Sequence, residues 1–355
     1  MIGLQQLLKT VVKQGATDMH LVAGAPPALR IDGRMVRVKA RDLSADEVKE
    51  LCYSVLTDEQ KSRFETTKEL DFSFGIKNTA RFRGNLMHQR GVVSGVFRKI
   101  PLNIPELSTL NMPPIVSEIA NFPNGLVLVT GPTGSGKSTT IASIISKINR
   151  ERRGHIVTLE DPIEYIHDHI GCIVNQREVT VDTNSYKEGL KHILRQDPDV
   201  CLIGEMRDHE TIEAALTIAE TGHLVFATLH TNNAISTINR LVNVFPSDEQ
   251  DRVRVQLSLT LNAVVSQRLL PQIGGGIVAA AEVLVLSSSI RNLIRENKLH
   301  QIYGMMQVGQ NKSGMVTLNQ SLMNLIVKRK VDVKVAFEES PDVDELDQMM
   351  RKAGV

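Results

Sequence analysis

A glycine-rich segment at residues 131–138, GPTGSGKS, fits the pattern G-x-x-x-x-G-K-[ST] at every fixed position. Its glycines allow successive backbone N–H groups to point inward around a phosphate, and the helix expected to follow adds positive charge at its N-terminus. Lys137 is expected to reach the β- and γ-phosphates of ATP, and the Ser138 hydroxyl to hold Mg²⁺. The nucleotide-binding residues predicted here are Gly131, Thr133, Gly134, Ser135, Gly136, Lys137, Ser138 and Thr139.

Two acidic positions follow apolar runs of the strand type. Glu160 ends the run HIVTLE, and Glu205 comes just after VCLIG. Ligands of doubly wound sheets bind beyond the carboxyl ends of the strands, so both acids are expected to face the nucleotide. We assign Glu160 to the base that orients the attacking water and Glu205 to the Mg²⁺ side, although the residues alone also allow the reverse. Asp161 and Glu164 are interpreted as turn and surface positions.

Two histidines, His223 and His230, flank the apolar run at residues 224–228. Their odd separation would send them to opposite faces of a continuous strand, which argues against a metal pair. His230 lies at the carboxyl end and is predicted to sense the γ-phosphate, as a third catalytic residue. His223 is assigned to nucleotide binding. For both, a histidine packed in the core is the alternative.

Arginines of the N-terminal region provide a second set of candidate phosphate ligands. Arg81 and Arg83 alternate with apolar residues, and Arg98 lies on the next expected strand. The planar guanidinium binds phosphate in a bidentate manner, so this strand face is predicted to close over the triphosphate. A solvent-exposed charged face is the alternative. Arg207 is a further candidate nucleotide ligand, unless it only pairs with Asp208.

The elements that position these residues form an alternating pattern in the C-terminal two thirds of the chain. Continuous apolar runs are typical of strands buried on both faces of a parallel sheet, and helical patterns separate them, which predicts an α/β fold. The runs are at residues 126–129, 155–159, 200–203 and 224–228. From about residue 256 helices are expected to dominate, interrupted by a glycine turn and one apolar run. The tail, residues 338–355, is interpreted as a solvated end.

The first hundred residues predict a separate α+β domain. A helix is expected to end at Gly15, and Ser44 with Glu47 forms a capping box ahead of another. Strands are expected at residues 70–76, 80–87 and 92–100. A proline-rich stretch then marks a boundary, because proline interrupts regular structure. The domains are therefore placed at 1–100 and 124–355, with a linker at 101–123.

Composition restricts the function further. The 355 residues are 42% hydrophobic and 23% charged, an ordinary globular balance. The net charge of +1 argues against a dedicated nucleic-acid binder, and no apolar run reaches the ~20 residues of a membrane-spanning helix. The N-terminus lacks secretory-signal features, and the three cysteines are too scattered for a disulfide framework or a zinc site. We expect a reduced cytoplasmic protein.

Several segments together resemble the type II/IV secretion ATPases. EDPIE (160–164), GEMRD (204–208) and TGHLVFATLH (221–230) resemble that family's Asp box, Walker B motif and His box, and ATDMHL (16–21) resembles its opening segment. The Walker B segment has Glu205 without the aspartate that is common in other P-loop enzymes, which is similar to the family's own variant. SIRNLIRE (289–296) resembles the AIRNLIRE signature of the pilus-retraction branch, with Ser289 in place of alanine. The tetracysteine segment usual in assembly ATPases is not found.

This resemblance implies a PAS-like N-terminal domain, a RecA-like P-loop motor domain and a homohexameric ring that hydrolyses ATP with Mg²⁺. Nucleotide would lie between the two domains of a subunit and be completed by a neighbour. The implied partners are an inner-membrane platform protein and, indirectly, pilin, with the protein held peripherally at the inner membrane. The signature residues would act in retraction, unless they form an ordinary amphipathic helix. They are Ile290, Arg291, Asn292, Leu293, Ile294, Arg295 and Glu296.

Three alternatives stay open from the sequence. The first is an accessory retraction ATPase or an assembly ATPase. The second is a nucleic-acid translocase on the same fold, which the near-neutral charge and the absence of tryptophan weaken. The third is a nucleotide-binding regulator without useful turnover.

Overall fold

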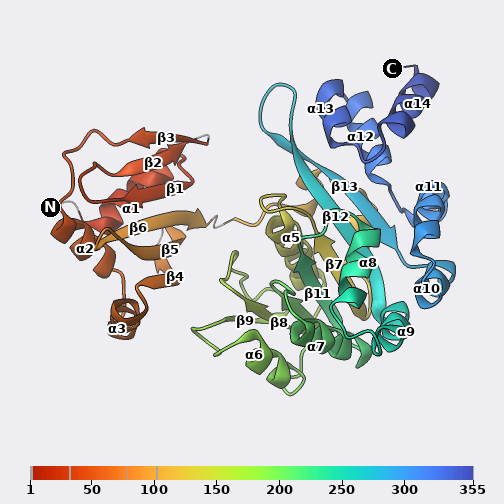
Figure 1. The fold of residues 1–355 in the computed structure, drawn as a ribbon, viewed down its shortest axis with the longest axis horizontal. Coiled ribbons are helices and arrows are strands. Elements are labelled where there is room, and N and C mark those ends of the chain that lie inside the picture. The colour runs from red at the N-terminus through yellow and green to blue at the C-terminus, as the bar shows by residue number, and fades with distance from the viewer. Residues whose placement is uncertain (1–2, 32, 78, 101–102, 355) are drawn as a thin grey trace. The chain divides into compact units, whose positions relative to one another are not determined.

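Backbone contacts divide the chain after Asn103 into the units Met1–Asn103 and Ile104–Val355. The computed structural model describes residues 3–31, 33–77, 79–100 and 103–354, without the side chains of residues 309–312. Figure 1 labels the elements of both units. Each unit is described by itself below.

The first unit is a six-stranded antiparallel sheet in the order β3-β2-β1-β6-β5-β4. Apolar side chains of its helices pack with Phe82, Leu86 and Phe97 of the sheet, which confirms the α+β prediction. The capping box of Ser44 and Glu47 is present at the start of α2. Helix α3 is not predicted by the sequence, because Phe64 is its single buried residue. The bounds are α1 (Leu4–Lys13), β1 (Asp18–Leu21), β2 (Ala28–Ile31), β3 (Arg34–Arg37), α2 (Ala45–Tyr53), α3 (Asp58–Thr67), β4 (Glu69–Ile76), β5 (Ala80–Gln89) and β6 (Val92–Ile100).

The second unit is built on a seven-stranded sheet in the order β13-β12-β7-β11-β10-β8-β9. All of its strands run parallel except β13, which is antiparallel to β12. The four predicted apolar runs are β7, β8, β10 and β11, so the α/β prediction is confirmed. The strand bounds are β7 (Gly125–Thr130), β8 (His155–Glu160), β9 (Ile173–Glu178), β10 (Val200–Ile203), β11 (Leu224–Leu229), β12 (Leu261–Pro271) and β13 (Ile277–Val285).

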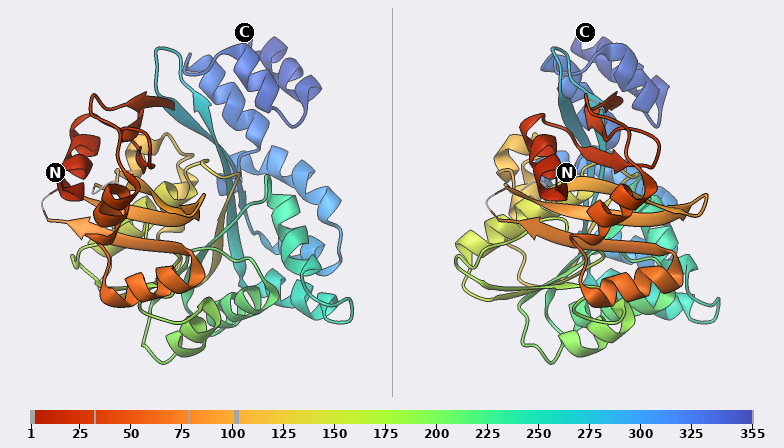
Figure 2. Two further views of the ribbon diagram at one scale, coloured as in Figure 1. Left: turned by 60° about the vertical axis from the view of Figure 1, so that its left-hand side comes forward. Right: turned by 90° about the vertical axis from the view of Figure 1, so that its left-hand side faces the viewer.

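Helices cover both faces of this sheet. One face packs against η1, α4 and α5, and the other against α6 to α11, as the buried side chains of the two core clusters show. Figures 1 and 2 show the sheet between these helical layers. The bounds are η1 (Leu107–Leu110), α4 (Ile115–Ile119), α5 (Lys137–Glu151), α6 (Tyr186–Ile193), α7 (His209–Glu220), α8 (Ala234–Asn243), α9 (Gln250–Thr260), α10 (Ser288–Arg295), η2 (Leu299–Gln301) and α11 (Ile302–Ser313).

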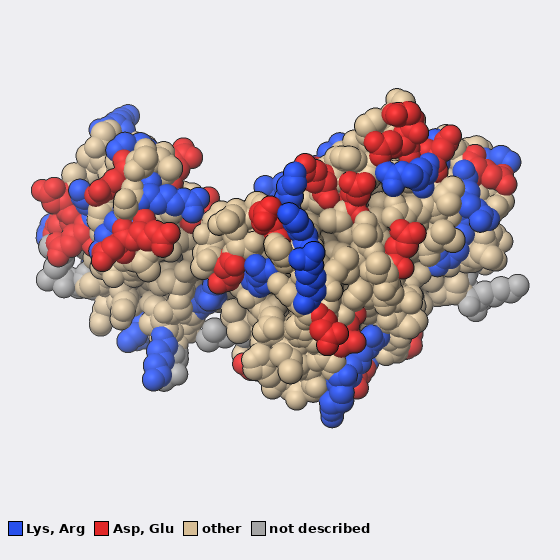
Figure 3. Space-filling view, turned by 90° about the horizontal axis from the view of Figure 1, so that it is seen from below, with Lys and Arg blue, Asp and Glu red and all other residues tan. Residues whose placement is uncertain are grey.

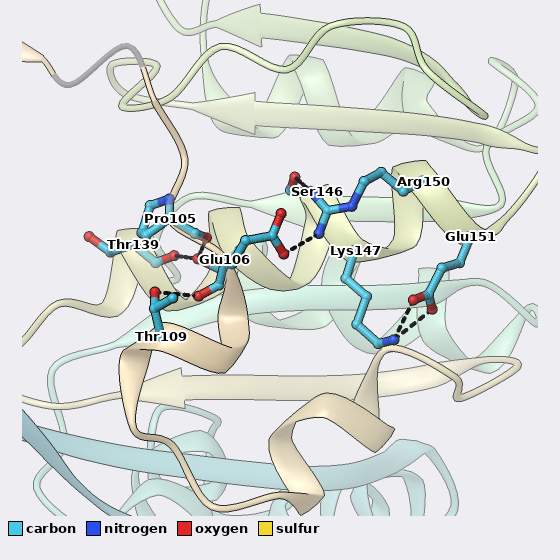
Figure 4. A network of polar contacts seen from close by, with 9 residues as sticks. Pro105, Glu106, Thr109, Thr139, Ser146, Lys147, Arg150 and Glu151 are labelled. Carbon is cyan, nitrogen blue, oxygen red and sulfur yellow. Dashed lines mark hydrogen bonds and ion pairs between the residues drawn. The ribbon is translucent and has the colours of Figure 1, made fainter.

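The segment expected to be a linker is largely packed into the second unit. Leu107, Val116 and Ile119 are buried against α5. Arg150 of α5 donates to Glu106 over 2.9 Å, within a network of polar contacts that also includes Pro105 (Figure 4). The prolines do interrupt regular structure, but the apolar residues between them still gain by burial. The division after Asn103 falls within the predicted linker 101–123, and residues from Ile104 onward belong to the second unit.

The C-terminal region also differs from expectation. Helices do dominate from residue 256, and the predicted apolar run is strand β13, but β12 was missed: the two strands form a long hairpin across the glycine turn 274–276 (Figure 2). The tail is not a solvated end, since Leu346 and Met350 pack with Leu270 and Val278 of that hairpin. The helices there are α12 (Leu318–Val327), α13 (Val333–Glu339) and α14 (Val343–Ala353). In the described part of the chain, no helix has the length and apolar character needed to cross a membrane.

Candidate nucleotide-binding site

The phosphate loop, residues 131–138, connects the buried strand β7 to α5, as predicted. Gly131, Gly134 and Gly136 have φ values of 142°, 81° and 86°. Residues other than glycine rarely adopt such φ values. The backbone path of the loop therefore requires glycine at these three positions. The loop has the geometry that presents backbone N–H groups to a phosphate.

Lys137 lies over the phosphate loop. Its Nζ donates to the carbonyl oxygens of Gly131 at 2.9 Å and Pro132 at 3.0 Å. Burial lowers the pKa of Lys137, and the nearby charge of Glu205 acts in the opposite direction. This mutual influence places the Glu205 carboxylate near the ammonium of the phosphate loop, although 68 positions separate the two residues in the sequence.

The carboxyl ends of the parallel strands bring the predicted catalytic residues to one edge of the sheet. The register pairs Thr130 with Leu229, and Ile203 with both Ala227 and Leu159. The phosphate loop, His230, Glu205 and Glu160 follow or end these strands, so they share that edge. The topology therefore confirms the predicted placement of these residues at the carboxyl ends of the strands, and their catalytic roles stay predictions.

Glu205 lies in a cluster of polar contacts with two other predicted site residues. Its carboxylate accepts from Arg207 at 2.8 Å and lies 3.0 Å from Nε2 of His230. The hydrogen bond from Arg207 lowers the pKa of Glu205, against the effect of partial burial. Glu205 is thus held as an anion, the form that attracts a metal ion or a positively charged side chain. Arg207 pairs with Glu205, whereas Asp208 caps α7 through the N–H of Thr211.

Glu160 lies in a different environment, inside the protein. It is 8% exposed, and its Oε1 accepts from Thr158 at 2.7 Å and from Gln176 at 3.2 Å. Burial raises the pKa of Glu160 to about 6, in spite of these hydrogen bonds. A carboxylate with a pKa near neutrality is suited to accept a proton from water.

The two remaining ligands of the phosphate loop differ in their surroundings. Ser138 is exposed at the start of α5, while the hydroxyl of Thr139 lies 2.9 Å from that of Tyr165. Oxygen ligands such as a serine hydroxyl and a carboxylate suit Mg²⁺, which usually binds one or two protein groups together with substrate phosphates. The residues present therefore fit Mg²⁺ held by Ser138 and Glu205. In the described part of the chain, no group of three or more His, Cys, Asp or Glu is placed to hold a metal.

His223 does not join this group within the chain. It precedes Leu224, which pairs with Gly125 at the beginning of β7, so His223 lies at the opposite edge of the sheet from the phosphate loop. Its Nδ1 lies 3.1 Å from the Ile218 carbonyl oxygen. The strand predicted between the two histidines is present as β11, and its six residues place them at opposite edges of the sheet.

The three arginines of the first unit share one face of its sheet. Arg83 pairs in register with Arg98, and Arg81 lies two residues before Arg83. Arg98 donates to the buried Asp18 over 2.7 Å, Arg83 lies 3.8 Å from Asp71, and Arg81 donates to Ser73. The predicted alternation along β5 is correct. Their assignment to nucleotide stays a prediction.

Several residues around the site carry no motif. Thr158 and Gln176 donate hydrogen bonds to Glu160. Burial raises the pKa of Tyr186, and the nearby charges of Glu160 and Glu205 raise it further. Thr158 could have been found, because residues two apart on a strand share a face. Gln267 of β12 donates to the Ser135 carbonyl over 2.6 Å, and no local signal points to it.

The predicted signature segment forms α10, and its residues divide between core and surface. Ile290 and Ile294 are fully buried, while Asn292, Arg295 and Glu296 are exposed. Arg291 donates to the carbonyl oxygens of Ser258 at 2.7 Å and Leu259 at 3.1 Å, and to Asn262 at 2.8 Å. An open groove of about 650 Å³ lies between this helix and α11. Its lining includes Asn292, Leu293, Arg295, Gly304 and Val308.

Surface charge agrees with the balanced composition. On the face drawn in Figure 3, basic and acidic side chains are interspersed over each unit. A nucleic-acid groove normally gathers basic residues on one surface. That face therefore offers no support for the translocase alternative.

Comparison with known proteins agrees with the family resemblance seen in the sequence. Residues 2–330 match the sequence model of a family described as "Type II/IV secretion system protein". The chain is 47% identical over 339 residues to the type IV pilus retraction ATPase PilT of Pseudomonas aeruginosa, covering 96% of this chain and 98% of that protein. It is also 47% identical to a twitching motility protein of Neisseria gonorrhoeae, over 91% and 87% of the two chains. The crystal structure of the pilus retraction motor PilT with bound ADP matches with a TM-score of 0.93 and 49% identity, over 98% of this chain and 100% of that one.

Proposed function

The chain belongs to the type II/IV secretion system protein family, and on that premise we propose that it is an ATP-hydrolysing motor that powers retraction of a type IV pilus. The observation that carries this proposal is 47% identity to a pilus retraction ATPase over 96% of the chain. The convergence of the phosphate loop, Glu205 and Glu160 at one sheet edge supports hydrolysis.

The residues of the site take distinct roles in this proposal. The phosphate loop binds the phosphates of ATP through backbone N–H groups, and Lys137 moves from its own loop carbonyls to the β- and γ-phosphates. Ser138 and Glu205 would hold Mg²⁺, which when bound neutralises charge on the phosphates. His230 is proposed to sense the γ-phosphate, and its position 3.0 Å from Glu205, at the sheet edge of the phosphate loop, supports this role.

The opposite pKa shifts of the two acids support our assignment of their roles. Glu160 has its pKa raised to about 6 and is the proposed base that orients water. Glu205, with its pKa lowered by the bond from Arg207, remains anionic and serves on the Mg²⁺ side. Two carboxyls with pKa values moved apart are a common sign of divided acid–base roles.

Replacement of Lys137 tests the enzymatic part. We expect Lys137→Ala to lose at least about 100-fold in ATP turnover, because removal of a phosphate-binding charge destabilises the transition state. Lys147→Ala is the matched control, since Lys147 lies on the same helix and pairs with Glu151 at 2.6 Å (Figure 4). Steady-state phosphate release by the purified proteins is the measurement. Unchanged turnover in Lys137→Ala would remove the assignment, and absence of turnover in the unaltered protein would favour a regulator.

The cellular part of the proposal concerns assembly and partners. We propose a homohexamer in the cytoplasm that is held at the inner membrane by a platform protein of the pilus machine, with pilin as the indirect substrate. A deletion strain separates retraction from assembly, because loss of a retraction motor leaves extra surface pili whereas loss of an assembly ATPase leaves none. Stimulation of ATPase activity by DNA would instead revive the translocase alternative.

A further inference from the structure

Gln267 lies on β12 beside the phosphate loop. The ladder between β12 and β7 ends with Ser266 opposite Thr130, so Gln267 comes next to Gly131, the first residue of the loop. A Cβ built on Gly131 would lie 2.3 Å from the Gln267 carbonyl oxygen. The loop therefore packs directly against the backbone of β12, and glycine permits that approach.

The side chain of Gln267 makes a specific contact with the phosphate loop. Its Nε2 donates to the carbonyl oxygen of Ser135 over 2.6 Å, and the two residues are 2% and 3% exposed. A buried backbone carbonyl needs a donor, because an unpaired one destabilises the fold. Lys137 occupies the carbonyls of Gly131 and Pro132, and Gln267 supplies the donor for Ser135.

The direction of this carbonyl determines the direction of the next N–H group. A trans peptide is planar, with its C=O and N–H pointing to opposite sides, and the bond between Ser135 and Gly136 is trans. Because the Ser135 carbonyl points toward β12, the N–H of Gly136 points away from β12. We propose that Gln267 is a positioning residue that holds this peptide with its N–H turned toward the phosphates of a bound nucleotide.

An amide side chain at position 267 destabilises the fold, which supports a functional reason for keeping it there. Among the described residues, neither Oε1 of Gln267 nor Oγ of Ser135 has a hydrogen-bond partner, although both atoms are buried. Buried polar atoms without partners destabilise a protein, and an apolar side chain of similar length would avoid the unpaired oxygen of the amide. The contact with Ser135 is the contribution that the amide alone can make. This inference rests on the proposed nucleotide-binding function.

Comparison of two nucleotides tests the positioning role. Gln267→Met keeps the length of the side chain but removes the donor. We expect its Kd for ADP to rise about ten-fold, the equivalent of about 1.4 kcal/mol, whereas its Kd for AMP should change less than about two-fold because AMP lacks the β-phosphate that the loop binds. Displacement of a fluorescent ADP analogue measures both constants.

Asn319→Leu is the matched control. Asn319 is fully buried, and its Nδ2 donates to the Asp342 carbonyl over 2.8 Å in the C-terminal helices. Its replacement should lower stability but leave ADP affinity unchanged. Wild-type ADP affinity in Gln267→Met, or an equal loss for ADP and AMP, would reject the positioning role. Absence of ADP binding by the unaltered protein would reject the nucleotide function itself. If Gln267→Met does not fold, Gln267→Leu, which also lacks the donor and adds no charge, carries the same expectations.

Discussion

Glu160 is the residue whose environment most directly limits the chemistry. It is buried beside Thr158 and Gln176, and its pKa is raised to about 6 because burial disfavours the charged form. A general base acts in its ionised form, so ATP turnover should fall as the pH is lowered through about 6. The charged form of Glu160 also destabilises the fold. In the unfolded chain the Glu160 carboxyl loses its proton near pH 4.5, whereas in the folded protein it does so near pH 6. The contribution of Glu160 to the free energy of unfolding therefore decreases as the pH rises from about 4.5 to about 6.

Thr158→Val tests this assignment through the pH profile. The hydroxyl of Thr158 donates to Glu160 over 2.7 Å and stabilises the carboxylate. Removing that bond should move the acidic limb of the kcat profile upward by about one pH unit, because a hydrogen bond to a charged group contributes about 1.5–3 kcal/mol. Thr217→Val, on an exposed helix position, should leave the profile unchanged. An acidic limb that does not move in Thr158→Val would assign the base to another residue.

At the residue scale, the sequence predicts groups that lie within a local motif. Glu160 ends a strand, Glu205 closely follows one, and Lys137 lies in the loop motif that follows β7, so the parallel sheet brings the three to one edge. Gln267 could not be predicted in this way, because 132 positions separate it from Ser135 and its neighbours form no recognisable pattern. His223 was assigned to nucleotide binding because it belongs to a local motif, but that motif spans a whole strand and His223 lies at the edge away from the phosphate loop.

Among the elements, α10 combines an internal anchor with an exposed side. Arg291 binds the end of α9 and the start of β12, and burial lowers the pKa of its guanidinium. Ile294 is fully buried, so its replacement cannot separate a retraction role from folding. Asn292 and Arg295, which line the groove, are the positions that can.

Exposed and buried variants of α10 should therefore behave differently. Asn292→Ala with Arg295→Ala should change stability by less than about 1 kcal/mol and keep ATP turnover, yet reduce twitching motility. Ile294→Ala should lower the free energy of unfolding by about 2–5 kcal/mol through the cavity that it leaves, and so lose both activities. Lys328→Ala, exposed at the end of α12, is the surface control. Normal twitching in the exposed double variant would leave α10 with a structural role alone.

Strand β12 shows why some elements escape prediction. Leu261 and Val264 pack with one core cluster, whereas Ala263 and Val265 pack with the other. A strand buried on both faces shows no alternation of apolar and polar residues, so its sequence resembles that of a buried helix. The buried strand β7 was predicted because its continuous apolar run is one of four that alternate with helical patterns.

On the scale of the whole molecule, the sequence predicts an α+β region followed by an α/β region. The boundary between the two regions was harder to predict. The prolines at residues 105, 113 and 114 suggested a linker, but the apolar residues between them pack against α5. Balanced charge, with a net value of +1, argues against a dedicated nucleic-acid binder. Family membership then connects hydrolysis at the site with work on a pilus.

A strain whose native copy carries Glu205→Gln provides the most direct test that ATP hydrolysis drives retraction. The substitution keeps the shape of the side chain but removes the charge that Arg207 and His230 contact, so turnover should fall at least about 100-fold. Surface pili and twitching zones are then counted at normal protein abundance. The proposed function predicts no twitching and more surface pili than the parent strain carries. Twitching at the parental level, in spite of abolished ATP turnover, would contradict it.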